Sequence, residues 1–292
     1  MLVRVFAEES RTFQRMRALL VPLIFFVKTT WPKWRGQVKK VTAFVGTARK
    51  KHTYYTVHQF LSSLQSLGDV EYEIVHLTDY HLETCRGCKT CFNKGEEFCP
   101  LKDDRDVIIE NMLTSDGVVF ASPNYSYQVS AIMKTLLDRL GFAFHRPRFF
   151  GKTFTSIVAQ GIYGGSKIVQ YLDFAGMGLG FNVVKGSCTT ALDPMSEQER
   201  RKIDNIVAAH SRRFHHRLSH KPYPEPTLFK LWIFRASRTS MRLMLDETYR
   251  DYTFYRDKGW FESDYFYPVR LNMFKKAVGS LFDYTISRSA KR

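Results

Sequence analysis

Four cysteines lie within 15 residues and are the most reactive feature of this 292-residue sequence. They are Cys85, Cys88, Cys91 and Cys99, in the pattern Cys-x2-Cys-x2-Cys-x7-Cys-Pro. Thiolates at such short spacings can converge on one metal centre, and the pattern is closer to iron–sulfur proteins than to the two separated pairs of zinc sites. A 4Fe-4S cluster, zinc and free redox-active thiols remain the alternatives. The fifth cysteine, Cys188, is expected to pack in the core.

A second candidate site is the segment 46–53, Gly-Thr-Ala-Arg-Lys-Lys-His-Thr. It joins an apolar run to an amphipathic stretch, and such a strand-to-helix turn presents backbone N–H groups and the positive end of the helix dipole to an anion. Gly46 permits close approach, Thr47 and Thr53 offer hydroxyl groups, and Arg49 offers a guanidinium. The segment matches neither the P-loop nor the three-glycine dinucleotide pattern. It suits a phosphate monoester; the alternative is an ordinary turn with solvated basic residues.

The elements that must position these residues alternate between strand and helix patterns. The predicted strands are Val41–Val45, Glu71–Leu77, Gly117–Ala121, Thr153–Ala159 and Phe181–Gly186. The predicted helices between them are Thr53–Leu67, Asp104–Leu113, Ser126–Gly141 and Lys167–Leu179. Short apolar strands with helical crossovers predict an α/β fold with a doubly wound, five-stranded parallel sheet. Ligands bind such sheets beyond the carboxyl ends of the strands, so the loops after Val45, Ala121 and Ala159 form the candidate site.

Four motifs, taken in order, resemble those of one protein family. They are Gly46 to Lys50 with Thr53, the Cys-x2-Cys-x2-Cys run, Pro100-x2-Asp103-Asp104, and Ser122-Pro123-Asn124-Tyr125. In these motifs the sequence is similar to the NADPH-dependent FMN reductase and iron–sulfur flavoprotein branch of the flavodoxin-like superfamily. The resemblance covers residues 41 to about 190. Thr47 and His52-Thr53 stand where the family more often has Ser and Asn-Thr.

The resemblance implies an FMN-dependent oxidoreductase that takes electrons from NAD(P)H. It places the FMN phosphate at Thr47, Arg49 and Thr53, and the isoalloxazine ring between loops 123–128 and 160–165. The implied flavin contacts are Gly46, Thr47, Arg49, Thr53, Pro123, Asn124, Tyr125, Ser126, Gly161, Gly164 and Gly165. No acid–base catalytic residue is expected, because hydride transfer asks the protein to align two rings and to tune the flavin by hydrogen bonds.

The resemblance also bears on the cysteines. Iron–sulfur flavoproteins use this compact motif for a 4Fe-4S cluster near the flavin, whereas many relatives keep similar cysteines without a demonstrated cluster. Two further functions stay open beside NAD(P)H oxidation. One is an iron–sulfur flavoprotein that relays electrons between protein carriers. The other is a non-enzymatic adapter that docks to a membrane or partner. The sequence does not identify the electron acceptor.

The formal charge of +16 lies almost entirely outside the predicted domain. Lys and Arg outnumber Asp and Glu by 9 to 2 in residues 1–40 and by 20 to 12 in residues 191–292, but only by 15 to 14 in residues 41–190. We therefore expect a basic, apolar N-terminal arm (1–40), an FMN-binding domain (41–190) and a helical, basic and aromatic C-terminal extension (191–292). The extension should contain helices at 195–218 and 228–245.

Charge and composition also suggest partners. The stretch Ala18–Val27 is too short to span a bilayer, but with Trp31 and Trp34 beside it the arm suits peripheral membrane contact. Packing of the arm on its own domain or on a second subunit is the alternative, and we expect a homo-oligomer. Nucleic acid is not an expected partner, because no recognised binding motif is present. Clustered cysteines without a signal peptide predict a cytoplasmic protein.

Overall fold

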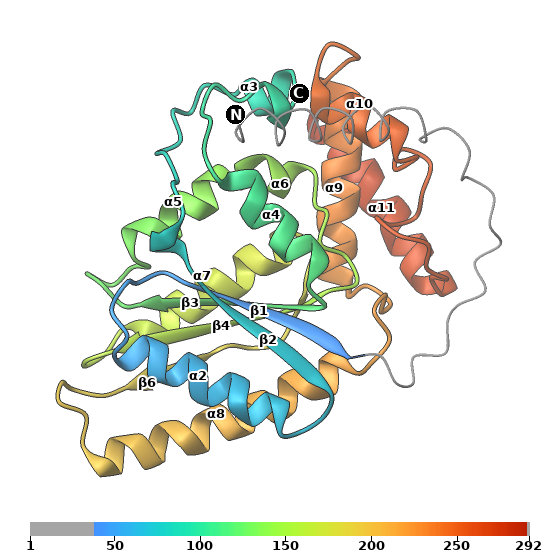
Figure 1. The fold of residues 1–292 in the computed structure, drawn as a ribbon. Coiled ribbons are helices and arrows are strands. Elements are labelled where there is room, and N and C mark those ends of the chain that lie inside the picture. The colour runs from blue at the N-terminus through green and yellow to red at the C-terminus, as the bar shows by residue number, and fades with distance from the viewer. Residues whose placement is uncertain (1–37, 291–292) are drawn as a thin grey trace, which may run out of the picture. The chain divides into compact units, whose positions relative to one another are not determined.

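A parallel sheet forms the centre of residues 38–290, the part of the chain that the computed structural model describes (Figure 1). The predicted N-terminal arm, including Ala18–Val27, lies outside the described residues. The strands are β1 (Lys39–Val45), β2 (Val70–His76), β3 (Gly117–Pro123), β4 (Thr153–Gln160), β5 (Asn182–Val183) and β6 (Ser187–Thr190). Their order is β2-β1-β3-β4-β5, with β6 also paired to β4, and every pairing is parallel. The flavodoxin-like, doubly wound sheet predicted from the sequence is thus confirmed.

The fifth strand position differs in detail from the predicted strand at 181–186. Two short strands, β5 and β6, occupy it, and the chain leaves the ladder between them. At Gly186 the backbone comes so close to β4 that an added Cβ would lie 2.1 Å from the Ser156 hydroxyl oxygen. The Gly186 N–H donates to the Asp173 carboxylate at 3.0 Å instead of to a neighbouring strand. This local contact interrupts the strand and shifts its second half to residues 187–190.

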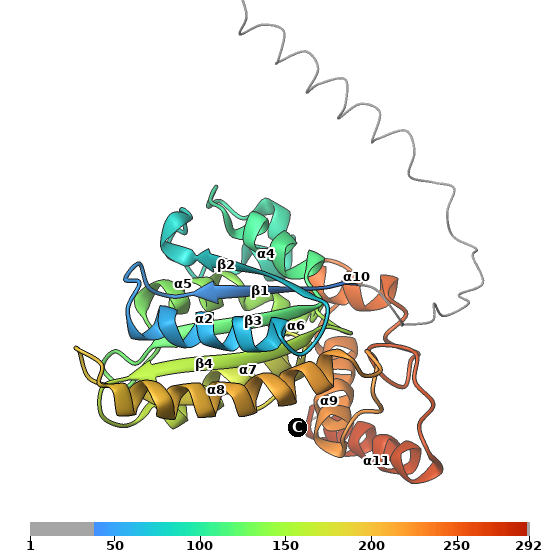
Figure 2. The same ribbon diagram turned by 60° about the horizontal axis from the view of Figure 1, so that its bottom comes forward.

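Helices cover both faces of the sheet (Figure 2). On one face α2 (His52–Gln65) and α8 (Glu197–Leu218) pack on the side chains of Val41, Ala43 and Val45. On the other, α4 (Arg105–Thr114), α5 (Ala131–Arg139) and α7 (Gly165–Gly178) pack on Phe44, Val118 and Phe120. Because the central strands are buried on both faces, most of their residues are apolar, and Thr42, Thr155 and Ser156 are buried exceptions.

The helix after β3 begins five residues later than predicted. Ser126 and Tyr127 have positive φ angles of 50° and 63°, which a helix cannot accommodate. They form a tight turn in which the backbones of Tyr125 and Gln128 bond to each other at 3.0 and 2.9 Å. The Ser130 side chain then accepts the Met133 N–H and starts α5 at Ala131. Residues 125–128 therefore form a loop at the edge of the sheet.

The C-terminal extension is helical, as predicted. Beyond α8 it contains α9 (Leu228–Met244), α10 (Arg250–Asp257) and α11 (Met273–Ala290). Side chains of α9, α10 and the loop after α10 form a third buried cluster, which includes Phe234, Tyr255 and Trp260. Phe150, from the loop before β4, packs against this cluster and joins it to the sheet domain.

Short helices complete the described residues. They are η1 (Leu77–Asp79), α3 (Thr90–Asn93), η2 (Glu96–Phe98) and α6 (Gly141–His145). Two of them, α3 and η2, lie in the segment that carries the four clustered cysteines. Within residues 38–290, no helix is both long and apolar enough to cross a bilayer.

Candidate functional site

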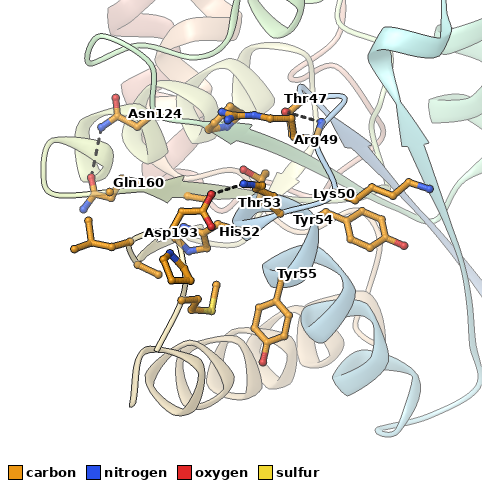
Figure 3. Close-up of a pocket in the computed structure, with 18 of the residues that line it drawn as sticks. Thr47, Arg49, Lys50, His52, Thr53, Tyr54, Tyr55, Asn124, Gln160 and Asp193 are labelled. Atoms are coloured by element: carbon orange, nitrogen blue, oxygen red, sulfur yellow. Dashed lines mark hydrogen bonds and ion pairs between the residues drawn. The ribbon is translucent and has the colours of Figure 1, made fainter. Parts of the chain in front are cut away.

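A cleft of about 670 Å³ opens at the carboxyl ends of β1, β3 and β4 (Figure 3). In the sheet, β2 lies on one side of β1, whereas β3 and β4 follow on the other side of β1. The strand order therefore reverses between β1 and β3. This is the position at which doubly wound sheets bind ligands. The cleft is lined by the loop before α2, the loops after β3 and β4, and the segment between β6 and α8.

The loop before α2 presents several groups that can bind an anion. Among the described residues no side chain caps α2, so the first N–H groups of this 14-residue helix are available to a ligand. The Thr47 hydroxyl accepts the Arg49 N–H at 3.2 Å, which folds the loop back on itself. Thr47 and Thr53 are buried at the base of the cleft, and Arg49 and Lys50 stand exposed at its rim. The loop thus combines backbone donors, hydroxyl groups and positive charge.

Two glycines are needed at this site for different reasons. A Cβ added at Gly46 would lie 2.6 Å from the Ser130 hydroxyl oxygen and 3.1 Å from the Met133 Cβ, so the β1 end needs glycine to pass α5. A Cβ at Gly161 would meet no atom of residues 38–290 within 4 Å. Because Gly161 lines the cleft, the space beside it belongs to the cleft itself.

The predicted phosphate loop is joined to the loop after β3. Arg49 Nη2 donates to the Tyr125 hydroxyl at 2.8 Å, and the guanidinium carbon lies 6.0 Å from the centre of the Tyr125 ring. Tyr125 and Tyr127 are 43% and 59% exposed. Tyr125 lines the cleft, and both tyrosines belong to the loop before α5.

The loops after β3 and β4 also hold each other. Asn124 Nδ2 donates to the Tyr163 carbonyl at 2.9 Å, and the Tyr127 and Tyr163 hydroxyl groups are 2.6 Å apart. Gln160 Oε1 accepts the Gly165 N–H at 2.6 Å, which fixes the start of α7. Gly164 is in the left-handed region, with a φ of 95°, and a Cβ there would lie 2.7 Å from the Tyr127 ring. The two loops therefore form one connected wall.

Seven of the eleven predicted flavin residues line this one cleft: Thr47, Arg49, Thr53, Pro123, Asn124, Tyr125 and Gly161. The other four are placed beside it and shape the loops, since within the described chain Gly46, Ser126, Gly164 and Gly165 are not lining residues. The predicted segment 46–53 contains Lys51 and His52, which line the cleft although no contact was assigned to them, whereas Asp193 and Arg200 were missed. The segment before α8 was unexpected because its position depends on β6, which the sequence pattern did not reveal.

His52 illustrates how burial sets the charge of the cleft. Its Nε2 lies 3.1 Å from the Thr189 hydroxyl oxygen, which links α2 to β6. Burial lowers the pKa of His52, and the nearby Glu199 carboxylate raises it by less. The ring is therefore neutral at pH 7, and Arg49, Lys50, Lys51 and Arg200 supply the positive charge.

The four clustered cysteines surround a second, small cavity of about 80 Å³. Cys85 and Cys88 are exposed, Cys91 is half-buried and Cys99 is buried. Across residues 38–290 no group of three or more His, Cys, Asp or Glu side chains is placed to hold a metal ion. The thiols are thus neighbours around one space without converging on a single point.

Cationic side chains lie at the buried end of this cavity. Arg139 Nη1 lies 3.2 Å from the Cys99 Sγ, while its other nitrogens bond both oxygens of Asp103 at 2.8 and 3.0 Å. Burial raises the pKa of Asp103, but the bonds from Arg139 and from the Glu83 N–H outweigh this effect and hold it below its ordinary value. This gives the Pro100-x2-Asp103-Asp104 motif a physical role, because Asp103 fixes the arginine that touches a cysteine.

Comparison with known proteins agrees with this geometry. The sequence model of the family described as NADPH-dependent FMN reductase matches residues 39–192. An iron–sulfur flavoprotein of Archaeoglobus fulgidus is 30% identical over 162 residues, which cover 53% of this chain and 79% of that protein. A second one from the same organism is 27% identical over 232 residues, covering 76% of this chain and 99% of that protein.

A solved structure shows the same fold. The crystal structure of RosB with the bound intermediate 8-demethyl-8-formylriboflavin-5'-phosphate superimposes with a TM-score of 0.52 and 13% identity, covering 80% of this chain and 92% of that chain. At this identity the likeness concerns the fold alone. The family match spans the sheet, most of the residues that line the cleft, and the cysteine motif, and therefore the chain belongs to the NADPH-dependent FMN reductase family.

Proposed function

We propose that the cleft binds FMN and that the protein is an oxidoreductase which passes electrons from NAD(P)H through the flavin to an acceptor. The observation that carries this proposal is the coincidence of three features at the switch point of the sheet. They are the start of α2, which no side chain of residues 38–290 caps, the exposed guanidinium of Arg49, and the open space beside Gly161. Family membership supports the same cofactor.

The residues present fit FMN from the phosphate to the ring. The phosphate would accept the first N–H groups of α2 and the hydroxyl groups of Thr47 and Thr53, with Arg49 as counter-charge. The ring would lie over Gly161, against the wall formed by the loops after β3 and β4. Bound FMN would supply hydride and electron transfer. The protein's own task is to hold the ring flat, to donate hydrogen bonds to its edge, and to leave one face open to the nicotinamide.

Reduction of the bound flavin tests the proposed electron donor. Anaerobic protein reconstituted with FMN should bleach on addition of NADPH or NADH, and the ratio of the two rates gives the nucleotide preference. Flavin that binds but is reduced by neither nucleotide would instead favour electron delivery by a protein carrier.

A second proposal concerns the cysteines, because all four thiols border one small cavity with Arg139 at its buried end. We propose that they hold a 4Fe-4S cluster. The donor set fits such a cluster chemically, since four thiolates are its usual ligands and a buried cation offsets its negative charge. Cluster binding would require Cys85 and Cys88 to move towards Cys91 and Cys99.

Iron and sulfide content of anaerobically purified protein tests this second proposal. We expect Cys88→Ser to lose iron, while Cys188→Ser keeps it. Cys188 is a suitable control because it packs against the core, where burial raises its pKa to about 11. Zinc in place of iron, or equal metal content in both variants, would contradict the cluster.

A further inference from the structure

The C-terminal extension contacts the segment that carries the cysteines. We define the cysteine loop as residues 83–100. Its short helix α3 packs against α10 of the extension. The ring centres of Phe92, on α3, and His145, at the end of α6, are 4.4 Å apart. The Tyr255 hydroxyl of α10 donates to the His145 carbonyl at 3.1 Å. Residues more than 150 positions apart in sequence thus meet at the cysteine loop.

One buried guanidinium connects the two segments. Arg146 is fully buried and donates from Nη2 to the Cys91 carbonyl at 2.7 Å and to Glu96 Oε2 at 2.8 Å. Its Nη1 donates to the Asp251 carboxylate on α10. The second oxygen of Asp251 lies 2.7 Å from His145 Nδ1. Arg146 is therefore held from one side by the cysteine loop and from the other by the extension.

The charges around Arg146 show why Asp251 matters. Burial lowers the pKa of Arg146, Arg148 and Arg250 act in the same direction, and Glu96 opposes them. Glu96 is shared, because its other oxygen accepts Arg148 Nη2 at 2.8 Å. Without Asp251, three cationic side chains would face a single carboxylate. A buried guanidinium that loses one of its two carboxylate partners is destabilised, and we expect its bond to the Cys91 carbonyl to break more often.

We propose that Asp251 is a positioning residue for the cysteine loop: through Arg146 it fixes the backbone at Cys91 and at Glu96, and so holds Cys91 and Cys99 in place for metal binding. Asp251 lies beyond residue 192, where the family match ends. The extension therefore adds a support for the metal centre from outside the family domain. The part of this inference that concerns metal rests on the proposed cluster.

The first test uses metal-free, full-length protein and measures thiol accessibility. The alkylation rates of Cys91 and Cys99 with iodoacetamide are followed by mass spectrometry in wild type, Asp251→Asn and Asp257→Asn. Asp257 is the matched control, because it ends the same helix and is exposed. We expect both rates to rise about tenfold in Asp251→Asn, since the loop would open locally more often, and to stay unchanged in the control. Cys188 serves as the internal reference.

The proposal would be overturned if Asp251→Asn and Asp257→Asn had the same alkylation rate at Cys91 and the same rate at Cys99. A parallel rise at Cys188 in Asp251→Asn would also overturn it, because that would indicate general unfolding. Should Asp251→Asn not fold, Asp251→Glu keeps the charge and should show a smaller acceleration with wild-type FMN content. The second readout is the electron paramagnetic resonance spectrum after reconstitution with iron and sulfide. We expect a changed spectrum or lower iron content in Asp251→Asn alone. If wild type binds no iron, the proposed cluster fails, while the alkylation rates still decide the role of Asp251.

Discussion

At the scale of single residues, the cleft depends on two glycines that do different work. Gly46 allows β1 to pass the start of α5, whereas Gly161 leaves empty space in the cleft. The two effects are separable because one concerns the folded chain and the other concerns its ligand.

We predict opposite outcomes for the two alanine variants. Gly46→Ala should lower the free energy of unfolding of the apoprotein by about 1–3 kcal/mol, because the new methyl group overpacks against Ser130 and Met133. Gly161→Ala should leave that free energy unchanged but weaken FMN binding about tenfold, because the methyl group enters space that the ring needs. Urea unfolding and fluorescence titration measure the two quantities. Unchanged FMN affinity in Gly161→Ala would place the ring elsewhere.

The cleft residues in the loop before α2 could be predicted because they follow from a local strand-to-helix pattern. A glycine at a strand end, two hydroxyl groups and an arginine before a helix suit a phosphate whatever the rest of the chain does. Arg200 and Asp193 could not be found this way, since they reach the cleft only through the path of β6. Long-range contacts of this kind leave no spacing signal in the sequence.

At the scale of elements, α8 is fastened to the sheet by a buried histidine. His210 Nε2 lies 2.6 Å from the Thr155 hydroxyl oxygen on β4, and its Nδ1 lies 2.9 Å from the Ser187 hydroxyl oxygen on β6. Burial lowers the pKa of His210 to about 3. Between about pH 3 and pH 6.5 the ring is therefore neutral in the folded protein and protonated in the unfolded chain.

This arrangement predicts a pH dependence of stability. The unfolded chain binds a proton at His210 below about pH 6.5 and the folded chain does not, so the free energy of unfolding falls as pH decreases from there towards pH 3. The slope from this group is about 1.4 kcal/mol per pH unit. His210→Gln should be less stable at pH 7 and should lose this part of the slope. Urea unfolding at pH 7 and pH 5 measures it; parallel slopes in the two proteins would show that His210 is already charged or exposed.

Strands and helices could be predicted where their sequence patterns are continuous. The predictions were wrong where local contacts override the pattern. The three central strands and α8 are long, regular runs that the sequence shows plainly. The start of α5 was wrong because the turn at Ser126 and Tyr127 depends on contacts with the facing loop. The fifth strand was displaced because Gly186 bonds to Asp173 instead of to its neighbour.

At the scale of the whole molecule, the sheet domain and the C-terminal extension are joined by packed aromatic rings and by an ion pair. Phe150 stacks on Phe266 with ring centres 5.0 Å apart and meets Trp260 edge-on at 6.3 Å. Arg146 adds the ionic contact with Asp251. We therefore expect residues 38–290 to unfold as one cooperative unit.

Two optical probes test this cooperativity. Tryptophan fluorescence, measured with Trp31→Phe and Trp34→Phe in place, reports on the extension through Trp232 and Trp260, and release of bound FMN reports on the cleft. The two urea transitions should coincide in wild type, and Phe150→Ala should lower both midpoints together, by an amount equivalent to about 2 kcal/mol for a half-buried ring. Two separate transitions in wild type would mean that the extension folds independently.

The central claim is that the cleft beyond β1, β3 and β4 binds FMN, and an equilibrium titration of apoprotein with FMN tests it most directly. We predict saturation at one FMN per chain, with the dissociation constant raised about tenfold in Arg49→Ala through loss of a charge-assisted hydrogen bond to the phosphate. Arg242→Ala, an exposed arginine on α9, should bind as wild type does. Absence of FMN binding by wild type, or equal affinity in both arginine variants, would contradict the account.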